Sequence, residues 1–129
     1  MALSKVQMER LSKLTKEQLL EFIDMSQKNW WNLQNNYILY LNTEYGEEAA
    51  VKADGACFTA NAKVQMYRLK KLFGLKDDIP SLIDAMVLST IWANGDFEVY
   101  DVTDRNFKLR VTNCYQQVRR LEEGMGEFS

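Results

Sequence analysis

The 129-residue sequence contains no histidine. Imidazole is the side chain that most often serves as a general base near neutral pH, and it is also the commonest metal ligand in proteins. Its absence excludes Ser-His-Asp and Cys-His nucleophile systems and every histidine-ligated metal site. Any catalysis by this chain must therefore depend on carboxylates, cysteine, lysine, tyrosine or a borrowed cofactor.

The sequence also has few cysteines, no large excess of positive or negative charge, and no long apolar run. Cys57 and Cys114 form at most one disulfide and lack the Cys-x-x-Cys spacing of a metal site. Sixteen basic residues against eighteen acidic ones give a net charge of -2, so no general positive field attracts nucleic acid. The N-terminus lacks a secretion signal, and no apolar run approaches the ~18 residues of a membrane helix. We therefore expect a cytoplasmic protein that has no cofactor and binds neither nucleic acid nor membranes.

The composition is that of a globular chain, with 47% hydrophobic and 26% charged residues. A chain of this length buries roughly two-thirds of the surface that its unfolded form exposes, so it can build a core without disulfides or metals. We therefore expect residues 1–129 to form a single domain.

Helical periodicity dominates the first two-thirds of the chain. Thr15 to Gln18 matches a capping box, and it opens the longest amphipathic pattern. Apolar residues then recur at alternating spacings of three and four, in the row Leu19, Ile23, Ser26, Trp30, Leu33, Tyr37 and Leu41, with Gln27 and Gln34 among the residues on the other side. A further helix is predicted from Ala49 to Phe73, where Gly55 is a candidate kink or division into two helices and Gly74 is the stop. Another is predicted after Asp78, with Pro80 in its first turn and residues 93–96 as its end.

Beyond residue 96 the pattern changes from helical to alternating. Phe97 and Val99, and then Leu109 and Val111, predict a β-hairpin whose turn is Thr103 to Asn106. Helical spacing returns after Cys114. The expected fold is α+β and mainly helical, with three to four helices followed by the β-hairpin and a C-terminal helix. A lone hairpin is marginally stable, so we expect the sheet to be completed by the partner subunit of a homo-oligomer or by further chain of a longer protein.

Cys114 lies where the second predicted strand gives way to the last helix. A thiol at a helix N-terminus near Arg119 and Arg120 has surroundings that favour the thiolate, which makes Cys114 the candidate catalytic residue. The alternative is structural, because free cysteines are among the most buried residues and no base or second cysteine is near in sequence. Cys57, in a segment rich in alanine, is expected to pack in the interior.

Three further residues are candidates for ligand binding. Gln117 and Arg120 share a helix face and suit a carboxylate or phosphate group, although Arg120 equally suits a surface pair with Glu123 or Glu127. Trp30 belongs to an aromatic row that suits the wall of an apolar pocket, but such rows more often form a core or a dimer interface.

A group of carboxylates follows the long predicted helix. It consists of Glu44, Glu47, Glu48 and Asp54. Carboxylates complement the positive end of a helix, so we interpret this group as a solvated helix start rather than a metal site or an acid/base pair.

The segment Cys114-x-x-Gln117-x-x-Arg120-x-x-x-Gly124-x-Gly126-Glu127-Phe128, with Trp30, Gly46, Ala49 and the stretch from Leu69 to Leu75, resembles an uncharacterised family of small cytosolic proteins from anaerobic bacteria and archaea. That family is distantly similar to proteins named L-2-amino-thiazoline-4-carboxylic acid hydrolases. Its pattern continues into further cysteines, so the resemblance implies that this chain is a short member or the N-terminal part of a longer one. It implies no established activity.

Three functions are compatible with these patterns. The first is a small homodimeric cytoplasmic module that binds a small-molecule ligand, or has a structural role, through the helix faces around Trp30 and Cys114. The second is a hydrolase or thiol-redox enzyme that uses Cys114 with help from Gln117 and Arg120. The third is a truncated member of a metal-binding, cysteine-rich family.

Overall fold

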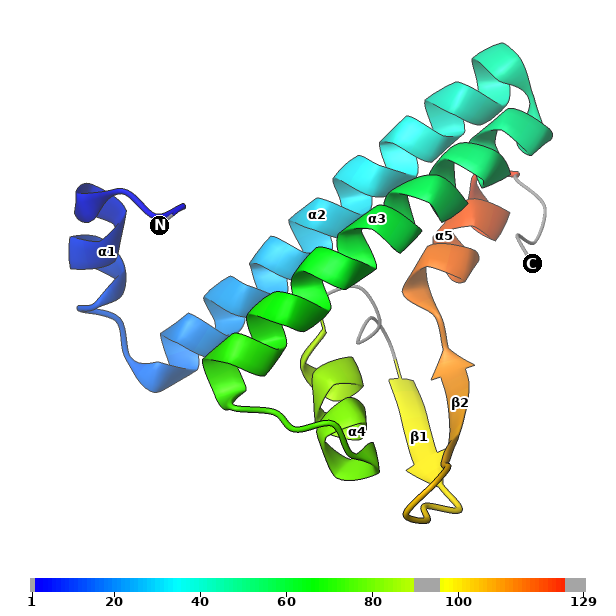
Figure 1. The fold of residues 1–129 in the computed structure, drawn as a ribbon. Helices are drawn as coiled ribbons and strands as arrows, with labels where there is room; N and C mark the ends of the chain where they lie inside the picture. The colour runs from blue at the N-terminus through cyan, green and yellow to red at the C-terminus, as the bar shows by residue number, and fades with distance from the viewer. Residues whose placement is uncertain (1, 90–95, 125–129) are drawn as a thin grey trace. The chain divides into compact units, whose positions relative to one another are not determined.

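The computed structural model describes residues 2–89 and 96–124. In these ranges the order of elements is α1 (Lys5–Leu11), α2 (Lys16–Tyr45), α3 (Glu47–Phe73), α4 (Ile79–Leu88), β1 (Asp96–Tyr100), β2 (Lys108–Asn113) and α5 (Tyr115–Glu122) (Figure 1). The predicted mainly helical α+β fold is confirmed. The chain divides into two compact units, unit 1 (Met1–Leu33) and unit 2 (Gln34–Ser129). No helix in the described ranges is both long enough and apolar enough to cross a bilayer.

Capping boxes start both helices of unit 1. The Ser4 hydroxyl accepts a hydrogen bond from the Gln7 amide at 3.2 Å, and the Gln7 side chain accepts one from the Ser4 amide at 2.9 Å. Thr15 and Gln18 make the same reciprocal pair at 3.1 and 3.0 Å, as predicted. These bonds satisfy amides that have no partner in the first turn of a helix, so α2 begins at Lys16, directly after its cap.

The covered face of α2 differs from the predicted apolar row. Ile23, Trp30, Leu33 and Tyr37 are exposed. Leu19 and Leu41, at the two ends of the row, are half-buried, and the other buried or half-buried positions of α2 are Gln27, Trp31, Gln34, Asn35, Ile38, Leu39 and Asn42. The prediction that the amides Gln27 and Gln34 lie on the water side is therefore wrong. In unit 2 the reason lies in two contacts with α3. Ile38 packs against Ala50, and Gln34 donates a hydrogen bond to Asp54, so the side of α2 that carries these two residues faces α3.

The core of unit 2 is small. Ile38 of α2 packs with the fully buried Ala50 of α3, and Leu39 and Leu41 complete the cluster. α3 runs through Gly55 without a break, so the suggested division there is wrong. It ends at Gly74, whose φ of 63° is the left-handed conformation of a helix C-cap, as predicted.

α4 starts with the predicted cap and proline. The Asp78 carboxylate accepts a hydrogen bond from the Ser81 amide at 2.8 Å, and Pro80 lies in the first turn. This bond, followed by one from the Ser81 hydroxyl, lowers the pKa of the Asp78 carboxyl, so the cap is charged at neutral pH and is lost as the pH falls through that lowered pKa. The helix ends at Leu88. The predicted end is at residues 93–96, of which residues 93–95 lie outside the described residues.

The predicted hairpin is confirmed. β1 and β2 pair antiparallel, with Phe97 opposite Val111 and Val99 opposite Leu109. The hydroxyl of Thr103 accepts hydrogen bonds from the amides of Arg105 and Asn106 at 3.2 and 3.0 Å, which closes the turn at the predicted place. Within the described ranges the sheet has these two strands.

Candidate functional site

A largely buried ion pair joins α3 and α5 in unit 2. Arg120 Nη2 lies 3.3 Å from Asp54 Oδ2, and the two side chains are exposed by only 9% and 18%. The other carboxylate oxygen of Asp54 accepts a hydrogen bond from Gln34 Nε2 on α2. One carboxylate thus connects three helices, and Gln34, Asp54 and Arg120 together are called the polar junction below.

The junction corrects the predicted surface pair of Arg120. It is Arg119 that pairs with Glu123, at 2.8 Å on the exposed side of α5, whereas Arg120 is buried. Glu127, the other predicted partner, lies outside the described residues. The true partner, Asp54, is 66 positions away in the sequence, so helical spacing alone does not reveal it.

The inward face of α5 is polar, and its apolar side chains point outward. Arg120 is buried and both Gln116 and Gln117 are half-buried. The exposed residues of the helix include Tyr115, Val118 and Leu121. This is the reverse of the usual amphipathic helix, whose apolar stripe faces the core. Gln117 and Arg120, the predicted ligand-binding pair, lie on this inward face.

Buried amide groups accompany the junction. Among the side-chain amides of residues 2–89 and 96–124, four buried atoms have no hydrogen-bond partner, namely Gln34 Oε1, Asn35 Oδ1, Gln116 Nε2 and Gln117 Nε2. Leaving such a group unpaired costs about 1 to 3 kcal/mol, so each is expected to bind water.

A void beside Arg120 measures about 10 Å³, with Asn35 and Leu39 of α2 and Glu123 also in its lining. A void of this size is about the smallest that admits one water molecule. The structure therefore gives the junction room for water at this point, and not for an organic ligand.

Cys114 is the N-cap residue of α5. It is half-buried, and its Sγ lies 3.9 Å from Gln116 Oε1. The two arginines expected to favour its thiolate are already paired with carboxylates, Arg119 with Glu123 and Arg120 with Asp54. Cys57 is exposed, so the expectation that it packs in the interior is wrong. The small side chains in that part of α3 stay in contact with water.

Trp30 lies in unit 1, where its ring makes an edge-to-face contact with Trp31 at a centroid distance of 4.8 Å. Of the predicted site residues, the structure brings Cys114, Gln117 and Arg120 together on or beside α5, and it places Trp30 in the other unit.

The predicted carboxylate group is dispersed. Glu47 and Glu48 occupy the first turn of α3, and Asp54 belongs to the polar junction. Across the described part of the chain, no three acidic or cysteine side chains gather where a metal ion would bind.

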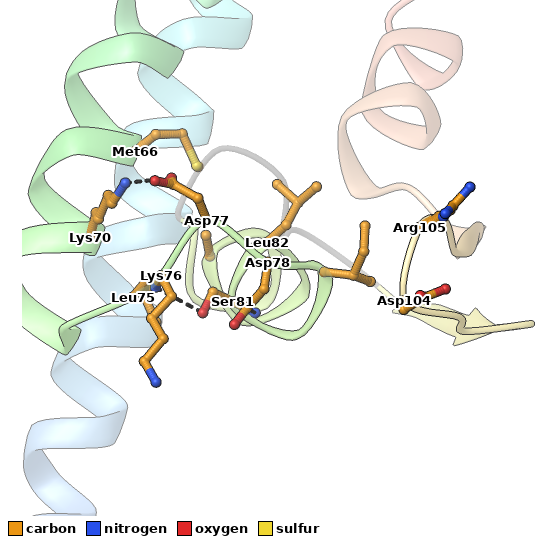
Figure 2. Close-up of a pocket in the computed structure, with 12 residues that line it drawn as sticks. Met66, Lys70, Leu75, Lys76, Asp77, Asp78, Ser81, Leu82, Asp104 and Arg105 are labelled. Atoms are coloured by element: carbon orange, nitrogen blue, oxygen red, sulfur yellow. Dashed lines mark hydrogen bonds and ion pairs between the residues drawn. The ribbon is translucent and has the colours of Figure 1, made fainter.

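A groove of about 460 Å³ crosses the start of α4, between α3 and the hairpin turn (Figure 2). The apolar part of its lining consists of Met66, Leu75, Ile79, Leu82 and Ala85. The polar part consists of Lys70, Lys76, Asp77, Asp78, Ser81, Asp104 and Arg105. The volume lies within the range of small-molecule sites.

Half of the charges in the groove already have a partner in the protein. Lys70 Nζ lies 2.5 Å from Asp77 Oδ1, and Figure 2 shows the two side chains pointing toward each other. The Asp78 carboxylate caps α4. For Lys76, Asp104 and Arg105 there is no ion pair with any residue that the structure describes. The charge of Lys76 acts on the Asp78 carboxylate, whose pKa it helps to lower. One positive charge, that of Arg105, and one negative charge, that of Asp104, are therefore left for a ligand.

Local hydrogen bonds hold the backbone that carries Lys76 and Arg105. The Lys76 amide donates to the Ser81 hydroxyl at 2.9 Å, and the Arg105 amide donates to the Thr103 hydroxyl at 3.2 Å. Residue patterns alone do not reveal this site, although they predict both the connection between α3 and α4 and the hairpin turn. Their charged residues look like ordinary turn residues until the fold brings the α3–α4 connection and the hairpin turn to one groove.

Comparison with protein families identifies the family of this chain. The model of a family described as "Family of unknown function (DUF6125)" matches residues 11–129. No curated protein and no solved structure matches the chain. The matched range includes Cys114, the polar junction and every residue that lines the groove.

Proposed function

We propose that this chain, which belongs to the family of unknown function DUF6125, is a small-molecule binding protein whose site is the groove at the start of α4. The observation that carries the proposal is the combination in one groove of apolar side chains with the charges of Asp104 and Arg105, which form no ion pair with any described residue. A charged group beside apolar surface gains from a ligand that supplies the opposite charge and covers that surface.

The charges favour a small zwitterion with an apolar body, such as an amino acid with an apolar side chain. Arg105 offers a planar pair of donors to a carboxylate, and Asp104 beside it accepts hydrogen bonds from an ammonium group. Met66 and Leu82 provide apolar contact for the rest of the ligand. Polyanions are disfavoured because the groove also carries Asp77 and Asp78.

The similarity to L-2-amino-thiazoline-4-carboxylic acid hydrolases stays a prediction, as do the range of source organisms and the cytoplasmic location. The compound in that name carries an amino group and a carboxylic acid, so it falls within the ligand class proposed for the groove. Hydrolysis also needs a nucleophile or a base, and Cys114 is not among the residues that line the groove. Binding is therefore better supported than catalysis.

Arg105→Ala is expected to weaken the binding of L-leucine about 10- to 100-fold, because a hydrogen bond between charged groups contributes about 1.5 to 3 kcal/mol. Isothermal titration calorimetry measures the change. The matched control is Arg110→Ala, which removes a guanidinium that is paired with Glu98 on the hairpin and should leave the affinity unchanged. Equal weakening by both variants, or no binding of apolar amino acids to the unmodified protein, would contradict the proposal.

Thiol reactivity distinguishes the proposed binding function from the alternative, a hydrolase or thiol-redox enzyme that uses Cys114. In a binding protein the exposed Cys57 should react with iodoacetamide several-fold faster than the half-buried Cys114, because access limits the reaction. Mass spectrometry of the Cys57→Ser and Cys114→Ser variants follows each thiol separately. Faster reaction at Cys114, persisting well below a pH of about 8.5, would support the thiol enzyme instead.

A further inference from the structure

The two charges that the groove leaves for a ligand both belong to the hairpin turn. Asp104 and Arg105 are consecutive residues, and Figure 2 shows both of them at this turn. Both residues are exposed, so no surrounding side chains enclose them. Their value to a ligand therefore depends on how firmly the backbone of the turn is held before the ligand arrives.

Thr103 directly precedes this pair, and its hydroxyl lies at the centre of the turn. The oxygen accepts hydrogen bonds from the amides of Arg105 and Asn106. The hydroxyl proton is within reach of Asn106, whose carbonyl and side-chain oxygens lie 3.2 and 3.1 Å from Thr103 Oγ1. The Thr103 amide also donates to the Asn106 carbonyl oxygen at 2.8 Å. The turn is thus closed around one hydroxyl.

A second contact holds only the base of the turn. Lys108 Nζ lies 2.7 Å from Asp101 Oδ2, and the two side chains are 63% and 61% exposed. Exposed ion pairs of this kind contribute little to stability. The pair joins the segments on either side of the turn, and it leaves the amide of Arg105 to the Thr103 hydroxyl.

We infer that Thr103 is a positioning residue of the groove, an inference that rests on the proposed function. Thr103 is not among the residues that line the groove, so it acts through Asp104 and Arg105. Its hydroxyl holds these two residues in one arrangement before the ligand binds. If the turn were not held, the apparent affinity would fall in proportion to the fraction of molecules with the turn in that arrangement.

The test is the affinity of Thr103→Val for L-leucine, measured by isothermal titration calorimetry. Valine keeps the branched shape of threonine and removes the hydroxyl. The variant should bind about 5- to 30-fold more weakly, because the ligand must then fix the backbone of at least one further residue. Thr103→Ser, which keeps the hydroxyl, should bind within about threefold of the unmodified protein.

The matched control is Thr112→Val on the same hairpin. The Thr112 hydroxyl donates to the Asp96 carbonyl oxygen at 3.1 Å, and neither residue lines the groove, so the affinity should not change. Equal weakening by Thr103→Val and Thr112→Val would show a general effect on the hairpin and would overturn the inference.

A second comparison shows whether Thr103 acts through Arg105. In the Arg105→Ala background, Thr103→Val should weaken binding by a smaller factor than in the unmodified protein, because one of the two positioned side chains is already gone. A general loss of structure would weaken binding by the same factor in both backgrounds, which would contradict a positioning role.

The same titrations separate this inference from the proposed function. If the unmodified protein does not bind L-leucine, both fail together. If Arg105→Ala weakens binding as expected but Thr103→Val does not, the groove remains the binding site and the role of Thr103 is overturned. Equal weakening by Thr103→Val and Thr103→Ser would overturn that role as well, since only the first removes the hydroxyl.

Discussion

Replacing Arg120 with alanine is expected to lower the free energy of unfolding by about 3 to 5 kcal/mol, the usual effect of removing one partner from a buried ion pair. The Asp54 carboxylate would then stay largely buried, with the hydrogen bond from Gln34 but without its cation. Urea denaturation followed by circular dichroism measures the loss.

Two further variants make this result specific. Arg119→Ala removes the neighbouring arginine, whose pair with Glu123 is exposed, and should cost less than about 1 kcal/mol. The double variant Asp54→Leu with Arg120→Met removes both charges at once, so it should be more stable than Arg120→Ala, and it keeps the test informative if the single variant does not fold. If Arg120→Ala were as mild as Arg119→Ala, the buried pair would be contradicted.

Replacing Ile38 with alanine should cost about 2 to 5 kcal/mol, because it removes the largest side chain of a small core cluster and leaves a cavity beside Ala50. Ala50 is fully buried and too small to fill the space. Ile38→Val, which removes a single methylene, should cost about 0.5 to 1.5 kcal/mol. The ratio of the two losses reports how tightly α2 and α3 pack at this point.

The control for the core variant is Leu72→Ala, at a residue of α3 that is 74% exposed. It should change the stability by no more than about 0.5 kcal/mol, as surface substitutions usually do. Similar losses at Ile38 and Leu72 would mean that Ile38 is not buried in solution.

The sequence was informative wherever structure depends on nearby residues. Helix starts at Thr15 and Asp78, the stop at Gly74 and the turn at Thr103 are each set by hydrogen bonds or backbone angles within a few positions. Such rules are local, so reading the residues in order is enough to predict them.

The sequence was less informative about which helix face is covered. Periodicity shows that α2 and α5 have apolar sides, but the covered side also depends on partners far along the chain. Asp54 binds Arg120 from 66 positions away, and it draws the amide side of α2 inward through Gln34. The groove was missed for the same reason, since its charges come from two separate connections.

The carboxylate of Asp54 has a geometric consequence for the packing of α2 and α5 against α3. Apolar rows slide and rotate past one another with little loss of contact, whereas hydrogen bonds weaken steeply when their angle changes. Each oxygen of this carboxylate meets a donor from a different helix, Gln34 on one side and Arg120 on the other. A single side chain of α3 thereby sets the rotation of both neighbours about their own axes.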